Sequence, residues 1–253
     1  MPASADPSPH RRASAAASSQ RTGSAPHAST RASGLPAWSQ VAVVCAHPDD
    51  ETFGLGAIIT HLVDAGTHLR VVSLTHGEGS TLGADDGADD DLADTRPREL
   101  RAAAATLGVH DVTIHGHPDG ALAGVPIEVL SADVAAASAG VEALLTFDHG
   151  GITGHPDHQR ATDVAVAVGR QLGIPVVGWA LPEPVAAQLR EEFGGAFVGR
   201  NTADLDHVIE VDRSRQLRAI GYHASQDNPV PRRRIELQGP YEHLRELHRP
   251  AAV

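Results

Sequence analysis

Histidine and carboxylate side chains gather in two short segments of this chain. The first reads His47-Pro48-Asp49-Asp50-Glu51, and the second reads His155-Pro156-Asp157-His158. Three successive carboxylates repel one another and are costly to hold beside an apolar strand unless they share a cation. His47 and Asp50 lie three residues apart across a tight turn, so they could bind one ion through nitrogen and oxygen. His158 could supply a third ligand, which would give the open three-ligand arrangement of catalytic zinc.

Further polar groups would remain beside such an ion. Asp49 could accept a proton from water, and His155 could stabilise an oxyanion or protonate a leaving amine. Asp157 could fix the orientation of His155. A bound divalent ion lowers the pKa of water to about 7 and polarises a carbonyl oxygen. A third His-Pro-Asp tripeptide begins at His117, but no further ligand follows it, so we interpret it as part of a loop without a metal role.

Both segments follow stretches that have the character of buried strands. Residues 41–46 form a continuous apolar run rich in β-branched residues, which is typical of a strand buried on both faces of a parallel sheet. Ligands of open α/β sheets bind beyond the carboxyl ends of such strands. Further strands are predicted at 69–74, 112–114, 143–147, 175–181 and 207–211. They alternate with helices predicted at 57–66, 96–107, 126–138, 159–172, 184–193 and from the cap at Asp212 to 223.

This alternation predicts a single α/β domain with a Rossmann-like, doubly wound and largely parallel sheet, covered by helices on both faces. No G-x-G-x-x-G motif follows the first strand, so dinucleotide binding is not predicted. Residues 1–37 are rich in Ala, Ser, Pro and Arg without periodicity, which predicts a disordered tail and leaves 38–253 as the folded domain. The Gly- and Asp-rich stretch 80–95 predicts a mobile acidic loop.

The composition of the 253-residue chain limits its partners. The formal net charge of −12 argues against nucleic-acid binding, because phosphate recognition needs a basic face. No apolar run approaches the roughly 20 residues of a membrane helix. Arg11-Arg12 is not followed by the apolar segment of an export signal, so a cytoplasmic location is expected.

The two histidine segments together resemble the signature of the PIG-L / LmbE-like N-acetylglucosaminyl deacetylases. The resemblance extends from about Val41 to Gln226. Within this range it includes residues 74–79, 96–100 and 222–226. It implies zinc bound by His47, Asp50 and His158, for which iron(II) is an alternative with the same ligands. It further implies that Asp49 is the general base and His155 the electrophilic histidine. By position, it implies substrate contacts from Glu78, Arg96 and Asp119.

The resemblance therefore predicts a zinc hydrolase that removes the acetyl group from a small N-acetylglucosamine-type amino sugar or its conjugate. In some members that hydrolyse a sugar–inositol acetamide, a tyrosine stands two residues before the second motif, where this chain has Thr153. One alternative is an amidase acting on a larger thiol–sugar conjugate in a wider cleft. Another is a non-catalytic metal- or sugar-binding protein, which would have no need of a base beside an open metal. A phosphoesterase usually needs a second metal or more positive charge.

Overall fold

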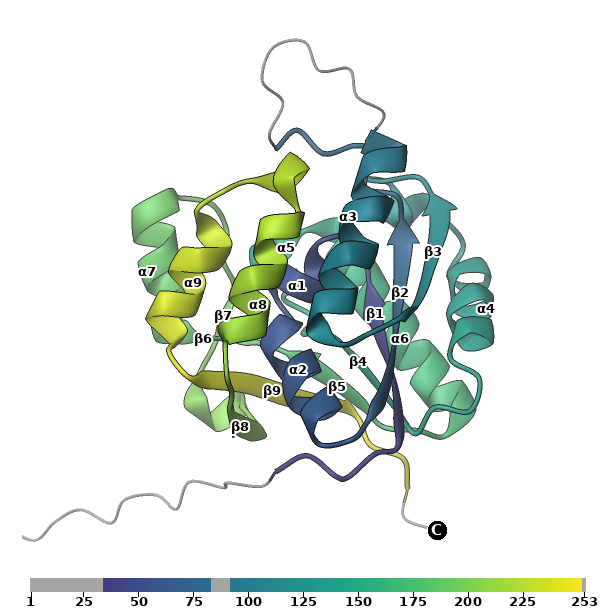
Figure 1. Cartoon of the computed structure of the whole chain (residues 1–253). Helices are drawn as coiled ribbons and strands as arrows, with labels where there is room; N and C mark the ends of the chain where they lie inside the picture. Colours follow the sequence, from purple (N-terminus) through teal and green to yellow (C-terminus); the bar gives the residue numbers. More distant parts are fainter. Residues whose placement is uncertain (1–33, 83–91, 252–253) are drawn as a thin grey trace, which may run out of the picture. The chain divides into compact units, whose positions relative to one another are not determined.

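A seven-stranded sheet forms the centre of the domain in a computed structural model, which describes residues 34–82 and 92–251 (Figure 1). The strand order is β3-β2-β1-β4-β5-β9-β8. The bounds of these strands are β1 Gln40–Cys45, β2 His68–Thr75, β3 Asp111–His117, β4 Ala143–Phe147, β5 Val176–Trp179, β8 His207–Glu210 and β9 Tyr241–His248. Strands β1 to β5 are parallel, whereas β9 runs antiparallel to both β5 and β8.

The order of the parallel strands changes direction between β1 and β4. The chain builds outwards from β1 through β2 to β3, and then returns to the other side of β1 to place β4 and β5. The carboxyl ends of β1 and β4 therefore diverge into loops on opposite sides of one crevice, which is where ligands of doubly wound sheets bind. The two histidine segments follow β1 and β4 at this point.

The central strand β1 is buried on both faces. Its residue Val43 pairs with Val71 of β2 and Leu145 of β4. Alternate side chains enter different hydrophobic clusters, with Val43 in one cluster and Val44 in the other. Because successive side chains of a strand point to opposite faces, the continuous apolar run of β1 is what a two-sided core requires.

Helices cover both faces of the sheet. On one face lie α2 (Gly56–Asp64), α3 (Leu92–Leu107) and α8 (Ser214–Ala219), and on the other lie α4 (Ile127–Ala137) and α6 (Pro156–Leu172) (Figure 1). The short helices α1 (Asp50–Phe53) and α5 (Gly151–Gly154) follow β1 and β4 directly. The helices α7 (Glu183–Phe193) and α9 (Val230–Gln238) pack against each other, and β6 (Leu181–Pro182) pairs with β7 (Gly199–Arg200).

The predicted fold class is confirmed, with differences in individual elements. Helix α3 begins at Leu92, so it includes the end of the stretch predicted as an acidic loop; the aspartates at 85–91 lie outside the described residues. The helix predicted up to 223 ends as α8 at Ala219 and continues as a 3₁₀ turn. Sequence reasoning missed α9 and β9 altogether. Within 34–82 and 92–251, no helix has the length and apolar character needed to cross a membrane.

The predicted tail falls mostly on residues 1–33, which lie outside the described part of the chain. Its last residues, 34–37, are described and adopt neither helix nor strand. Leu35 nevertheless packs against the main hydrophobic cluster, as does Trp38. The domain therefore extends a few residues further towards the N-terminus than position 38.

Candidate metal and catalytic site

The turn after β1 presents its side chains through backbone hydrogen bonds. The Oδ2 atom of Asp50, the first residue of α1, accepts hydrogen bonds from the backbone N–H groups of Ala46 and His47, each at 3.0 Å. Asp49 adopts φ 146°, a left-handed conformation that is rare for a residue with a Cβ atom. Such local strain is typical of functional sites, where the surrounding structure enforces it.

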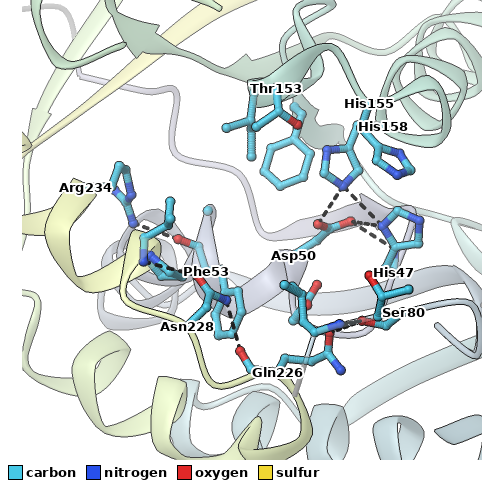
Figure 2. A pocket seen from close by; sticks show the side chains of 18 of the residues that line it. His47, Asp50, Phe53, Ser80, Thr153, His155, His158, Gln226, Asn228 and Arg234 are labelled. Carbon is cyan, nitrogen blue, oxygen red and sulfur yellow. Dashed lines mark hydrogen bonds and ion pairs between the residues drawn. The ribbon is translucent and has the colours of Figure 1, made fainter. Parts of the chain in front are cut away.

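The three predicted metal ligands come together at the end of the sheet. His158 lies in the first turn of α6, and its Nε2 atom is 3.2 Å from Nδ1 of His47 and 3.1 Å from Oδ1 of Asp50 (Figure 2). The ligand atoms of the three residues lie within 4.8 Å of one another. They therefore form a compact group at the carboxyl ends of β1 and β4.

The remaining nitrogen of each histidine is directed at an acceptor. Nδ1 of His158 is 3.0 Å from the backbone oxygen of Gly151, and Nε2 of His47 is 3.0 Å from Asp119 and 3.3 Å from Asp157. If these nitrogens donate, the two nitrogens that face each other both carry lone pairs. A cation, either a proton or a metal ion, must then lie between them. Because Oδ1 of Asp50 supplies a third donor, this arrangement fits the two-imidazole, one-carboxylate set of an open zinc site.

The electrostatic surroundings also favour positive charge at this point. Burial lowers the pKa of His47, but the carboxylates of Asp119 and Asp157 more than offset this and raise the pKa to about 10. Burial raises the pKa of Asp49 to about 6, although the nearby Arg96 guanidinium opposes the rise. A metal ion would replace the proton that His47 otherwise holds, since metal binding and proton release are coupled.

His155 caps the N-terminus of α6 and lies beside the cluster. Its ring centroid is 5.0 Å from that of His47 and 5.0 Å from that of His158. The backbone N–H of Asp157 donates to its Nδ1 atom at 3.2 Å, so the proton of the neutral ring lies on Nε2. Burial, together with the neighbouring histidines, lowers the pKa of His155 and favours this neutral form.

The carboxylate of Asp157 has a different environment from the one predicted. Its oxygens accept hydrogen bonds from the backbone N–H groups of Gly120 and Leu122 and contact Nε2 of His47. We expected this carboxylate to orient His155, but the contact with that ring comes from the backbone of Asp157. The Asp157 side chain instead fixes the loop after β3 and the orientation of a metal-ligand candidate.

Arg96 is buried beside Asp49 and forms hydrogen bonds within the protein. Its side chain donates to the backbone oxygens of Gly77 and Pro48 at 2.5 and 2.8 Å, and to Oδ2 of Asp49 at 2.9 Å. Only 3% of the residue is exposed, although it borders the pocket. The guanidinium close to Gly77 leaves no room there for a Cβ atom. These hydrogen bonds indicate that Arg96 positions Asp49, and its predicted contact with a substrate stays a prediction.

The other two predicted substrate residues lie on adjacent loops. Oδ2 of Asp119 accepts a hydrogen bond from the backbone of Gly79 at 2.8 Å, and Glu78 accepts one from the backbone of Asp119 at 3.1 Å. Asp119 lines the pocket as well as contacting His47. The exposed Glu78 holds the loop that carries Asp119. Their contacts with a substrate remain predictions.

Sequence reasoning missed a buried pair behind the site. Nε2 of His223 lies 2.9 Å from Oε1 of Glu51, and both side chains are fully buried. The other oxygen of Glu51 accepts a hydrogen bond from the backbone of Asp49 at 3.0 Å. Through this hydrogen bond, the Glu51–His223 pair helps to hold Asp49 in its strained conformation. Its only sequence signal was the match of residues 222–226 to the family pattern.

His117 does not join the site after β1. It forms a second group that could hold a metal ion, together with His115 on the same face of β3 and Asp133 on α4. Nε2 of His117 lies 2.8 Å from Oδ2 of Asp133. Our interpretation of His117 as a loop residue is wrong, because His117 is the last residue of β3, and its lack of a metal role stays a prediction.

A pocket of about 470 Å³ opens beside the cluster, and it is lined by Asp49 and His155, two of the three residues predicted for catalysis. His47, Asp49, Asp50, His155 and His158 all line it. A reacting group in this pocket would therefore meet the ligand set, a carboxylate and a neutral imidazole together. The fold and the site define an α/β protein with a histidine–aspartate cluster, able to bind a metal ion, at the carboxyl ends of its strands.

Residues 42–168 match the model of the PIG-L family, described as GlcNAc-PI de-N-acetylase, and the chain belongs to this family. It is 37% identical over 197 residues to a 1D-myo-inositol 2-acetamido-2-deoxy-alpha-D-glucopyranoside deacetylase from a Mycobacterium species, covering 67% of this chain and 61% of the relative. It is 30% identical over 221 residues to a protein of the same name from Salinispora arenicola, covering 73% of this chain and 72% of the relative.

The fold is shared with solved structures of more distant sequence. A structure of N,N'-diacetylchitobiose deacetylase from Pyrococcus horikoshii superimposes with a TM-score of 0.62 at 21% identity, covering 83% of this chain and 84% of that one. This likeness supports the architecture described above. The chain spans about three fifths of the length of the Mycobacterium relative.

Proposed function

We propose that this protein is a metal-dependent hydrolase that removes the acetyl group from an N-acetylglucosamine-type amino sugar or its conjugate. The observation that carries the proposal is the pair of histidine nitrogens, 3.2 Å apart, that face each other beside Asp50. They lie at the wall of a pocket that also contains a buried carboxylate and a neutral imidazole. A protein that only bound a metal would have no use for these two additional groups.

We propose zinc as the metal, held by His47, Asp50 and His158. Two imidazoles and one carboxylate suit zinc, and iron(II) is the alternative for the same set. When bound, such an ion supplies Lewis-acid polarisation of a carbonyl and a water of lowered pKa. The charge of Asp50 is already oriented for this purpose, because two backbone N–H groups hold its other oxygen.

The protein's own groups would move the protons. Asp49, held by Arg96, would accept a proton as water adds to the acyl carbon. The Nε2–H of His155 would then stabilise the oxygen that develops charge, and the proton taken up by Asp49 would pass to the nitrogen as the C–N bond breaks. The products are a carboxylate and a free amine. Asp119 would contact the sugar, and so would Glu78, whose side chain also holds the loop that carries Asp119.

The sugar–inositol acetamide named for the relatives is the first substrate to test, since the identity to them reaches 37%. Thr153 stands at the position of a tyrosine in some family members, so stabilisation of the developing oxyanion would depend on His155. The proposed hydrolase domain is the predicted 38–253, extended to Leu35.

The decisive experiment measures released amine across a panel of N-acetylglucosamine conjugates, using protein that is metal-free, reloaded with zinc or reloaded with iron(II). We expect no turnover without metal and recovery at about one ion per chain. Turnover that is untouched by a strong chelator would refute the metal-dependent mechanism. Zinc binding without turnover of any amide would instead identify a binding protein.

A further inference from the structure

The pocket beside the histidine cluster has two chemically different halves. Polar groups from the loops after β2 and β3 and from residues 224–228 border one side, including Ser80, Asp119 and Gln226. The other side is built from apolar side chains, which are Phe53, Phe147, Ile152, Trp179, Phe197 and Val230. Figure 2 shows Phe53 and Arg234 across the pocket from the histidines, with Ser80 nearer to His47. The histidine cluster adjoins both sets, because His47 contacts Asp119 and the ring of His158 lies close to that of Phe147.

The apolar half begins at a metal-ligand candidate and continues away from it. The ring of Phe147 lies 5.0 Å from that of His158, and the ring of Trp179 lies 5.7 Å from that of Phe147. The Arg234 guanidinium follows, 5.1 Å above the Trp179 ring. Arg234 donates to the backbone of Phe53 and to Gln238, so its hydrogen bonds are made within the protein. The half is therefore a recess lined by rings and closed by a flat guanidinium.

A strained residue contributes to this recess next to the proposed electrophile. Ile152 has φ 62° and ψ −60°, a conformation that is a genuine outlier for a β-branched residue. Glycine or asparagine would adopt it more easily. Its side chain lines the pocket and packs against the main hydrophobic cluster. An apolar side chain thus lines the same pocket as His155 at a position whose backbone favours a different residue.

The two sides of an N-acyl amino sugar differ in the same way. The sugar carries hydroxyl groups that need polar partners, whereas the acyl group carries only carbon and hydrogen beyond its carbonyl. An acetyl group offers a single methyl, which would leave most of the apolar half unfilled. An unfilled recess of this kind forgoes the favourable burial of apolar surface.

We propose that the apolar half is a subsite for the acyl group, and that the preferred substrates are N-acylated amino sugars with a linear acyl chain longer than acetyl. This inference rests on the proposed function, because it assumes amide hydrolysis at the histidine cluster. It names the acyl side of the substrate, which the family match does not identify. The sugar occupies the polar half, and the acyl chain extends along Phe147 towards Trp179.

The test compares the methyl glycosides of N-acetyl-, N-butanoyl- and N-hexanoylglucosamine with zinc-loaded protein. Each buried methylene is expected to raise kcat/KM about fourfold, and hexanoyl should exceed acetyl by about 200-fold. If kcat/KM is highest for the acetyl compound and falls as the acyl chain lengthens, the acyl subsite is refuted. The proposed deacetylation is unaffected by that result.

Variants locate the effect in the recess. Val230→Trp fills the recess, and Ile152→Asn removes apolar surface while relieving the strained backbone. Each should lower the hexanoyl-to-acetyl ratio of kcat/KM at least tenfold. Val129→Trp is the matched control, because Val129 is 47% exposed on α4 and does not line the pocket. It should leave the ratio unchanged. A ratio that is equally unaffected by all three variants would place the chain-length preference elsewhere and refute the subsite.

A binding measurement separates this inference from the proposed function. Trp179 lines the recess, so its fluorescence should respond to N-hexanoylglucosamine at lower concentrations than to N-acetylglucosamine, even in protein that does not turn them over. Trp38 is the other tryptophan, and a Trp38→Phe protein isolates the signal. Tighter hexanoyl binding without hydrolysis would support the recess and refute the hydrolase. Equal binding of the two compounds would refute the recess.

Discussion

Replacing Arg96 by methionine tests whether a buried guanidinium holds the proposed base in place. Methionine keeps an unbranched stem but offers no hydrogen-bond donors. The change removes the partners of two backbone oxygens, those of Gly77 and Pro48, and leaves the Asp49 carboxylate without its ion pair. The Arg96 side chain is 4% exposed and that of Asp49 is 14% exposed, so water replaces these contacts poorly.

Breaking a buried ion pair by removing one partner costs about 3–5 kcal/mol. For a domain of this size, 1 kcal/mol corresponds to about 2–4 °C, so the expected fall in Tm is about 6–20 °C. The strained backbone of Asp49 would also relax, because strain of about 1–3 kcal/mol persists only when its surroundings enforce it. The proposed base would then move, and kcat should fall together with Tm.

The assay measures Tm and kcat for Arg96→Met beside Arg98→Met. Arg98 lies on the same helix, but its hydrogen bonds to Asp94 and Thr95 are exposed. Its loss should change stability by at most about 0.5 kcal/mol and leave kcat unchanged. Equal Tm values for the two variants would show that the buried bonds contribute little. A large fall in Tm with unchanged kcat would show that Arg96 stabilises the fold without positioning Asp49.

Four further predictions follow from the site and its surroundings. Asp49→Asn should retain the metal yet lower kcat by about 10²–10⁴-fold; normal kcat at normal metal content would remove the base assignment. His158→Ala should lower metal content in elemental analysis, whereas His155→Ala should not; equal content in both would refute the ligand set. Asp148 is 4% exposed and paired with two arginines, so Asp148→Asn should cost about 3–5 kcal/mol in denaturant unfolding at pH 7. Deleting residues 1–33 should leave Tm nearly unchanged, and a large fall would show that they dock on the domain.

The Asp148 effect should depend on pH in a definite direction. Burial raises the pKa of this carboxyl, but hydrogen bonds from Arg200 and Arg245 outweigh it and lower the pKa below its ordinary value. A lowered folded-state pKa stabilises the protein above the unfolded value of about 3.9, and this stability is lost as pH falls through the folded value. The difference between wild type and Asp148→Asn should therefore shrink below about pH 4. A difference that is constant from pH 7 to pH 3 would contradict the pairing.

The parts of the fold that were predictable are those whose burial depends on apolar side chains. The run around Val43 fills both hydrophobic clusters, so its composition indicates its position directly. Helix α9 and strand β9 carry no such signal, because they contribute charged residues to the interior. Glu242 is fully buried and accepts hydrogen bonds from Trp179 and Arg213, and Arg234 is 3% exposed. Charges that are neutralised by partners distant in sequence resemble a solvated surface when read alone.

The candidate site, like the fold, was predictable from the sequence only in part. The grouping of His47, Asp50 and His158 was predictable because these residues lie in two short segments, each directly after a strand. The role of Arg96 was not predictable from the sequence, because its contacts with Gly77 and Pro48 join separate loops. The orientation of Asp157 depends likewise on the loop after β3, whose path only the fold defines.

The position of β9 also has a consequence for the growing chain on the ribosome. Strand β5 is complete at Trp179, but its antiparallel neighbour begins only at Tyr241. At about 5–20 residues per second, the intervening segment takes about 3–12 s to synthesise, and during this time one edge of β5 has no partner. Unpaired strand edges can pair with other chains, and a short edge strand limits that hazard. Synthesis rate and chaperone supply should therefore affect the yield of this protein most strongly between these two strands.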